Sequence, residues 1–187
     1  CGNASAPGAV ISLDPTSFGG IHGTSMTVVQ ARNQPLVTFP SGQSTPNALY
    51  TLLLVDEVEA STGSVFSGMR SYPHMAIVNV LGADAVYGAA GDIILPFYSP
   101  ANPDQVAHNY VFYLMQQNGF INVEQAKNMS LSRVNFGMID FMRTFNLHPP
   151  VAVNYATIFT DLFAGSLLQS YGLPVPECPR EALENMV

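Results

Sequence analysis

The sequence predicts a single domain that is mainly β, with helices only near its C-terminal end. From residue 10 to about 115, short apolar runs of strand length alternate with clusters of Pro, Gly, Ser and Asn, a pattern typical of strands joined by turns. After residue 130 the apolar spacing changes to that of an amphipathic helix. No linker-like stretch, repeat or charge run divides the sequence, so we expect residues 1–187 to form one domain.

Three of the predicted strands, at residues 50–56, 74–80 and 108–114, carry few polar side chains, and each begins or ends on an ionisable residue. We expect strands at residues 9–13, 24–29, 35–39, 50–56, 74–80 and 108–114. Strands this apolar are buried on both faces. Residues 91–107 precede the last strand and hold three prolines, so we expect a stiff loop there rather than a strand, forming one wall of a pocket.

Two helices are expected at the C-terminal end. Apolar residues from 134 to 145 recur at i, i+4, i+7, i+8 and i+11, with Ser132 as the N-cap. A second helix is expected from about Thr157 to Tyr171, with Gly172 as its terminator. These helices would cover the β domain.

The charge balance argues against several classes of partner. Charged residues make up 10% of the chain and the net charge is -7, whereas an average domain has about 25% charged residues. Lys127 is the only lysine and the five arginines are scattered. We therefore expect no nucleic-acid partner and no adsorption to an anionic membrane. No apolar stretch reaches the length of a membrane-spanning helix.

Several features indicate a secreted protein. The sequence opens on Cys1 with no initiating Met, as a mature form would after removal of a signal peptide. We expect a disulfide between Cys1 and Cys178, the alternatives being two unrelated thiols or a lipid-modified Cys1. Asn3 and Asn128 each begin an N-glycosylation pattern.

The ionisable strand ends predict a small polar pocket at one edge of the sheet. Asp56 ends one strand, and His74 and His108 begin two others, with Tyr110 close by. Two imidazoles and a phenol can donate hydrogen bonds to a small anion, and Asp56 can hold one imidazole in a fixed tautomer. The alternative is a structural role, in which Asp56 caps a turn and the histidines are merely satisfied at a sheet end.

Other chemistries are less well supported by the sequence. One Asp and two His satisfy the ligand count for zinc, but they lack a short-spacing motif, so we expect neither a metal nor a cofactor. No nucleophile motif or phosphate-binding glycine loop occurs. We therefore expect a protein that is not an enzyme.

Several segments in this order resemble the phosphatidylethanolamine-binding protein (PEBP) family, which includes the Raf kinase inhibitor protein, the yeast carboxypeptidase Y inhibitor and the plant flowering-time proteins. The resembling segments are Tyr50–Asp56, His74–Asn79, Gly82–Asp84 and His108–Phe112. The resemblance runs from about residue 10 to residue 163. It implies a large antiparallel sheet packed on a smaller one.

The resemblance also implies a non-enzymatic pocket that binds phosphate-type anions or phospholipid headgroups. The pocket Asp of the family carries over to Asp56, its two histidines to His74 and His108, and its tyrosine to Tyr110. Tyr72 corresponds to an aromatic residue that often precedes the first pocket histidine. All five residue types are present in the sequence.

This sequence departs from the family at positions around the pocket. The second Asp of the family's Asp-Pro-Asp motif is Val58, and the Arg beside the second histidine is Asn109. The glycines of the family's loop are missing from Tyr98–Asp104. These departures leave the expected fold unaffected but bear on phosphate binding.

Two functions follow as hypotheses. The first is a secreted PEBP-like protein that holds a small anionic or amphipathic ligand, of the phosphate or phospholipid-headgroup type, at the sheet edge. The alternative is an extracellular structural or storage protein, or a protease inhibitor, with a vestigial pocket and a protein partner. The lost Asp-Pro-Asp motif favours the alternative.

Overall fold

The computed structural model describes residues 10–12, 14–15, 23–38, 45–57, 71–82, 86–87, 91–102, 106–128, 133, 136–159, 169 and 172. The predictions for Cys1, Cys178 and Asn3 lie outside these residues.

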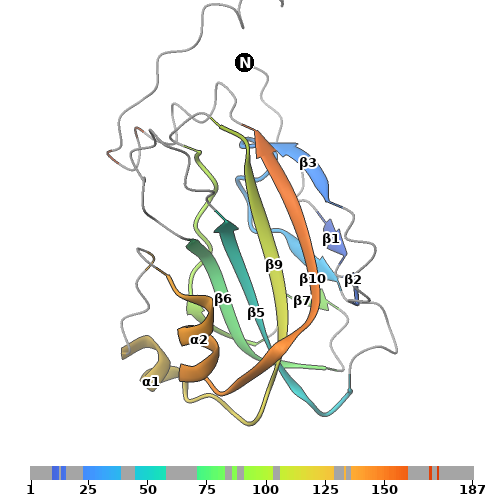
Figure 1. The fold of residues 1–187 in the computed structure, drawn as a ribbon, viewed down its shortest axis with the longest axis vertical. Helices are drawn as coiled ribbons and strands as arrows, with labels where there is room; N and C mark the ends of the chain where they lie inside the picture. Colours follow the sequence, from blue (N-terminus) through green and yellow to red (C-terminus); the bar gives the residue numbers. More distant parts are fainter. Residues whose placement is uncertain are drawn as a thin grey trace, which may run out of the picture.

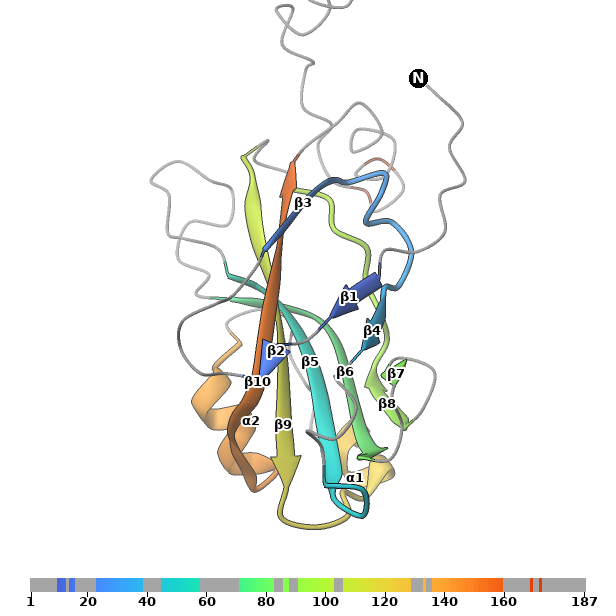
Figure 2. The same ribbon diagram turned by 90° about the vertical axis from the view of Figure 1, so that its right-hand side faces the viewer.

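A seven-stranded sheet forms the centre of the molecule (Figures 1 and 2). Its strands are β2 (Asp14–Pro15), β3 (Thr24–Thr27), β5 (Leu49–Glu57), β6 (Tyr72–Leu81), β8 (Asp92–Leu95), β9 (His108–Gln117) and β10 (Leu147–Phe159). The order is β2-β10-β9-β5-β6-β8, and β3 also pairs with β10. Neighbours in this order are antiparallel, whereas β3 runs parallel to β10.

A smaller sheet and two helices complete the described fold. The small sheet has the order β1-β4-β7 and consists of β1 (Val10–Ser12), β4 (Leu36–Thr38) and β7 (Val86–Tyr87). The helices are α1 (Val123–Asn128) and α2 (Met138–Thr144). Figure 2 shows the small sheet and the helices on opposite sides of the large sheet. The prediction of a mainly β fold with a large sheet packed on a smaller one is confirmed.

Each face of the large sheet has its own apolar core. On one face, Leu54 and Phe112 pack in a cluster that includes Val37 of the small sheet. On the other face, Val55 packs in a cluster that includes Phe141 of α2. Because the central strands are covered on both faces, their sequences are continuously apolar rather than alternating.

Strand β10 was not predicted from the sequence. The helix expected from Thr157 to Tyr171 is wrong at its start, because Thr157–Phe159 belong to this strand; residues 160–168 lie outside the described residues. Pro149 and Pro150 argue against a ladder strand. The pairing with β9 accommodates them by register shifts on both sides of Pro150.

The remaining differences concern helix boundaries and one loop. Helix α2 begins after Gly137 rather than after Ser132, which lies outside the described residues. Helix α1 was not predicted. The prediction of a loop throughout residues 91–107 is wrong at Asp92–Leu95, which pairs with β6 as the edge strand β8.

No helix among the described residues is long and apolar enough to span a bilayer.

Candidate functional site

A β-bulge in β6 brings His74 to the face of the sheet that carries Tyr110. Strand β5 pairs Leu54 with Met75 but Val55 with Pro73, so His74 is an extra residue in β6. Its ring meets the ring of Tyr110 edge-on, with 5.0 Å between the centroids. The sequence placed His74 at the beginning of a strand but did not indicate the bulge.

Asp56 occupies the same end of the sheet. It pairs with Tyr72 on β6 and with Tyr110 on β9, so the three side chains lie on one face. Asp56 Oδ2 is 2.7 Å from His108 Nδ1, and the two residues are only 5% and 8% exposed. Because a carboxylate oxygen accepts, this hydrogen bond places a proton on His108 Nδ1.

The second oxygen of the Asp56 carboxylate differs from the first in its hydrogen bonding. Asp56 Oδ1 is buried, and no hydrogen-bond donor from the described part of the chain reaches it. A buried polar atom without a partner costs about 1–3 kcal/mol, and more when the group is charged. Asp56 is therefore a costly side chain unless something else donates to it.

His74 is held by the loop after β8. Its Nδ1 lies 2.6 Å from the carbonyl oxygen of Tyr98, and the Tyr98 N–H donates to the His74 carbonyl at 2.8 Å. Since a carbonyl only accepts, the proton of His74 is on Nδ1. Burial lowers the pKa of His74 to about 4, although the bond to Tyr98 and the charge of Asp56 oppose this effect. At neutral pH its Nε2 therefore carries a lone pair.

Asn102 holds the hydroxyl of Tyr110. The hydroxyl donates to Asn102 Oδ1 at 2.6 Å, and Asn102 Nδ2 donates to the carbonyls of Ile158 at 2.6 Å and Val106 at 3.0 Å. Asn102 is buried and has a φ of 42°, a left-handed conformation that Asn tolerates better than most residues. The glycines of the family's loop are missing from this segment, as the sequence shows, and the hydrogen-bonded Asn102 lies within it.

Aromatic rings and one arginine surround the first residues of β6. The ring of Tyr72 lies 5.1 Å from that of His74 and 6.2 Å from that of Tyr98. Arg133 lies over the Tyr98 ring at 5.3 Å and donates to the carbonyls of Pro73 and Pro96. Burial raises the pKa of Tyr72, and the charge of Arg133 opposes this. Sequence reasoning missed Arg133, for which no motif exists.

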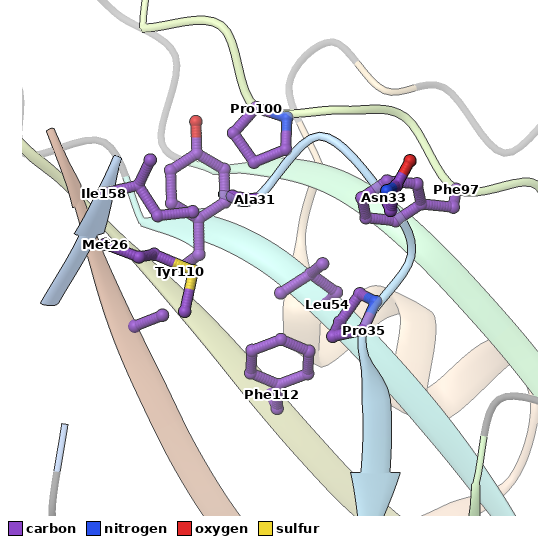
Figure 3. Close-up of a pocket in the computed structure, with 11 residues that line it drawn as sticks. Met26, Ala31, Asn33, Pro35, Leu54, Phe97, Pro100, Tyr110, Phe112 and Ile158 are labelled. Atoms are coloured by element: carbon purple, nitrogen blue, oxygen red, sulfur yellow. The ribbon is translucent and has the colours of Figure 1, made fainter. Parts of the chain in front are cut away.

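A small apolar cavity lies beside the polar residues (Figure 3). It encloses about 20 Å³, roughly the space of one water-sized group. Its lining comes from the sheet, the loop after β8 and the segment before β4, and consists of Met26, Ala31, Asn33, Pro35, Leu54, Phe97, Pro100, Tyr110, Phe112, Ala156 and Ile158. The Leu54–Phe112 pair is two residues from the Asp56–Tyr110 pair. Tyr110 therefore belongs to both the cavity and the polar group.

The structure thus brings the five predicted site residues together at one sheet end, while their binding role stays a prediction. Phe97 and Pro100, in the loop after β8, line the apolar cavity beside these residues, while a loop wall on the polar side stays a prediction. Within the described ranges, no three His, Cys, Asp or Glu side chains are placed to hold a metal ion. Asn128 is exposed at the end of α1, and its glycosylation also stays a prediction.

Part of this chain is similar in sequence to a curated protein. No protein-family model matches the chain. A 26 kDa secreted antigen of Toxocara canis is 32% identical over 138 residues, which are 71% of this chain and 49% of that protein. The chain thus spans about half the length of this curated relative.

Two solved structures share the fold. The solution structure of a protein named CG7054 has a TM-score of 0.56 and 24% identity, covering 85% of this chain and 89% of that chain. Carboxypeptidase Y inhibitor, solved in complex with its cognate proteinase, has a TM-score of 0.54 and 16% identity, covering 83% and 85%. At these identities the likeness is one of fold.

Proposed function

We propose that this chain, which has the phosphatidylethanolamine-binding protein fold in a divergent form, is a secreted, non-enzymatic binding protein. Its site holds the polar head of a small amphipathic ligand between Asp56, His74, His108 and Tyr110, with Tyr72 at the rim. The adjoining apolar cavity receives the short apolar part.

The observation that carries this proposal is the burial of so many polar groups at one sheet end. Asp56, His74 and His108 come from three strands and are each at most 8% exposed. Burying ionisable groups is costly, and such clusters beside a cavity are typical of binding sites. A strand end with a purely structural role could be filled more cheaply by apolar side chains.

The secreted location is supported by the Toxocara canis relative, which is named a secreted antigen. Because this chain spans about half of that protein, the relative's wider properties are not carried over. An extracellular setting also suits a chain with 10% charged residues and one lysine.

Native mass spectrometry of protein purified from its source tests the binding function. We expect a small molecule that is retained under native conditions, lost on denaturation and absent from the His108→Ala variant. His148→Ala is the matched control, because this histidine is exposed near the opposite end of β10. An empty wild-type protein, or equal retention by both variants, would contradict the proposal.

A protease inhibitor remains the second candidate. The fold likeness to carboxypeptidase Y inhibitor supports it, and so does the small size of the cavity, about 20 Å³, which leaves little room for a large ligand. In that case inhibition of a target protease would be unchanged by His108→Ala, because the surface rather than the pocket would make the contact.

A further inference from the structure

We infer that Asn118 is a site of spontaneous covalent modification, at which the chain closes a succinimide ring with Gly119 and then carries aspartate or isoaspartate. Asn118 follows the last residue of β9, whereas His108 of the candidate site is the first residue of that strand. The inference therefore concerns the opposite end of the sheet and is independent of the proposed binding function.

The pair Asn118-Gly119 has the covalent arrangement that this reaction needs. Asn118 is the only asparagine in the chain that is followed by glycine. The reaction requires the backbone nitrogen of the next residue to reach the side-chain carbonyl carbon, and a glycine there has no Cβ to hinder the approach. A Cβ built at Gly119 would meet no atom within 4 Å, so the surrounding chain also leaves room.

The turn holds the reacting groups only loosely. Asn118 and Gly119 are both exposed, and no acceptor in the described part of the chain binds the Gly119 N–H. The Asn118 side-chain nitrogen donates to the carbonyl oxygen of Asn146 at 2.9 Å and to its Oδ1 at 3.1 Å, both in exposed positions. Water can replace such bonds at little cost, so the side chain can turn toward Gly119.

The reaction is an internal attack followed by hydrolysis, and no atom is oxidised or reduced. The Gly119 backbone nitrogen loses its proton and attacks Asn118 Cγ, which forms the nitrogen–carbon bond of the succinimide ring. The bond between Cγ and Nδ2 breaks, and Nδ2 leaves as ammonia after it has taken up that proton. Water then adds to one of the two ring carbonyls and cleaves its bond to the nitrogen. One carbonyl gives aspartate and the other gives isoaspartate.

Aspartate at position 118 would weaken the link between the end of β9 and the turn before β10. The Asn118 amide nitrogen is the donor in both side-chain bonds to Asn146. A carboxylate has no donor, so its oxygens would lie against the oxygens of Asn146. The longer bond from the Asn118 backbone N–H to the Asn146 carbonyl, 3.4 Å, would remain.

Isoaspartate would also disturb the buried amide network at this end of the sheet. Its main chain runs through the former side-chain carbonyl and is longer by one methylene, so Gly119 shifts relative to Gln117. The Gly119 carbonyl accepts from Gln117 Nε2 at 2.9 Å. The same nitrogen donates to Asn79 Oδ1 at 2.9 Å, and Gln117 is buried. Modification of an exposed turn thus reaches a buried residue.

Incubation of the wild-type protein at pH 7 and physiological temperature tests the inference, with mass spectrometry of proteolytic peptides at intervals. We expect aspartate and isoaspartate to accumulate at position 118 at least about tenfold faster than at Asn109 and Asn122. Both of these asparagines are exposed, and they precede Tyr and Val. Equal rates at the three positions, or no modification of Asn118, would overturn the inference.

Gly119→Ala tests the role given to the glycine. The added Cβ enters open space, and Gly119 does not have a positive φ, so the variant should unfold at the same urea concentration as wild type. Modification of Asn118 should slow at least about tenfold, and an unchanged rate would overturn the inference. The wild-type comparison needs no variant, so it decides the inference even if Gly119→Ala does not fold.

Asn118→Asp tests the structural consequence without waiting for the reaction. It should unfold at a lower urea concentration than wild type, because the donor to Asn146 is lost. Asn122→Asp is the matched control. Asn122 Oδ1 accepts from the Gln125 N–H at the start of α1, and Asp serves equally well at such a position. Equal midpoints for the two variants would overturn the consequence inferred for the turn.

Discussion

Asn102 illustrates how single residues hold the site together. Three hydrogen bonds from one buried side chain connect the loop after β8 with β10 and with the hydroxyl of Tyr110. Its φ of 42° would be strained in most residues. The sequence offered no signal for this role, because the partners are up to 56 positions away along the chain.

Replacing Asn102 by Ala should reduce the free energy of unfolding by about 2–4 kcal/mol, because it leaves buried polar partners unpaired and puts Ala at a positive φ. Urea denaturation measures this change. The matched control is Asn109→Ala. The Asn109 side chain is exposed and accepts a hydrogen bond from the Thr157 hydroxyl. Equal losses for the two variants would contradict the role given to Asn102.

The pKa of His74 predicts a dependence of stability on pH. The pKa is about 4 in the folded protein and about 6.5 in an unfolded chain, so the unfolded state binds more protons between these values. Stability from this residue is therefore complete above pH 6.5 and is lost as the pH falls toward 4.

Unfolding experiments at pH 7 and pH 5 on wild type and His74→Gln test this dependence. The glutamine variant should lose less stability than wild type between the two pH values. A similar loss in both proteins would mean that His74 does not titrate as its burial implies.

At the scale of elements, a second β-bulge shows how a buried amide network sets the register of the sheet. Opposite the stretch of β5 from Tyr50 to Leu52, strand β6 contains one extra residue. Asn79, which lies in this part of β6, has a φ of 57°. Gln117 of β9 accepts from the Asn79 backbone N–H at 2.7 Å and donates to the Asn79 side chain at 2.9 Å. The network lies at the opposite end of β9 from the candidate site.

Gln117→Ala should cost about 2–4 kcal/mol of stability, because the Asn79 N–H and Thr51 hydroxyl lose their acceptor in a buried setting. Its neighbour Gln116, which is only half-buried, provides the control, and Gln116→Ala should cost less than about 1 kcal/mol. Thermal unfolding of the two variants measures the difference, and a reversed order would contradict this role of Gln117.

The elements that the sequence predicts well are those whose local pattern agrees with their tertiary setting. Strands β5 and β6 are buried on both faces, and β9 is buried on one face and partly exposed on the other. Their apolar runs are therefore unambiguous, and Asp56, His74 and His108 stand out at their ends. Strand β10 carries two prolines and depends on pairing with β9 for its register. The bulge at His74 and the contacts of Arg133 also come from pairing between distant segments, which no local pattern reports.

At the scale of the whole molecule, the large sheet is stabilised by a different layer on each face. The small sheet covers the face that carries the candidate site, and the helices cover the other. The resemblance seen in the sequence is confirmed at the level of this fold by two solved structures. The site and the helical layer are thus separated by the sheet itself.

This separation predicts that damage to the helical layer reduces stability without a direct effect on the site. Phe141 of α2 is buried among Phe136 and Phe145, so Phe141→Ala should cost about 3–5 kcal/mol. Ile139, 64% exposed on the same helix, is the control and should cost less than about 1 kcal/mol when changed to Ala. Denaturant unfolding checks both values, and a small loss at Phe141 would argue against the helical layer described.

The most direct test of the central claim, that the Asp56–His108 pair belongs to a ligand site, is a high-resolution crystal structure of protein purified from its source. The account predicts a bound molecule with a donor atom within hydrogen-bond distance of Asp56 Oδ1. A structure in which that oxygen accepts from a group of the chain itself, or only from water, would contradict the claim and favour a structural role for the buried pair.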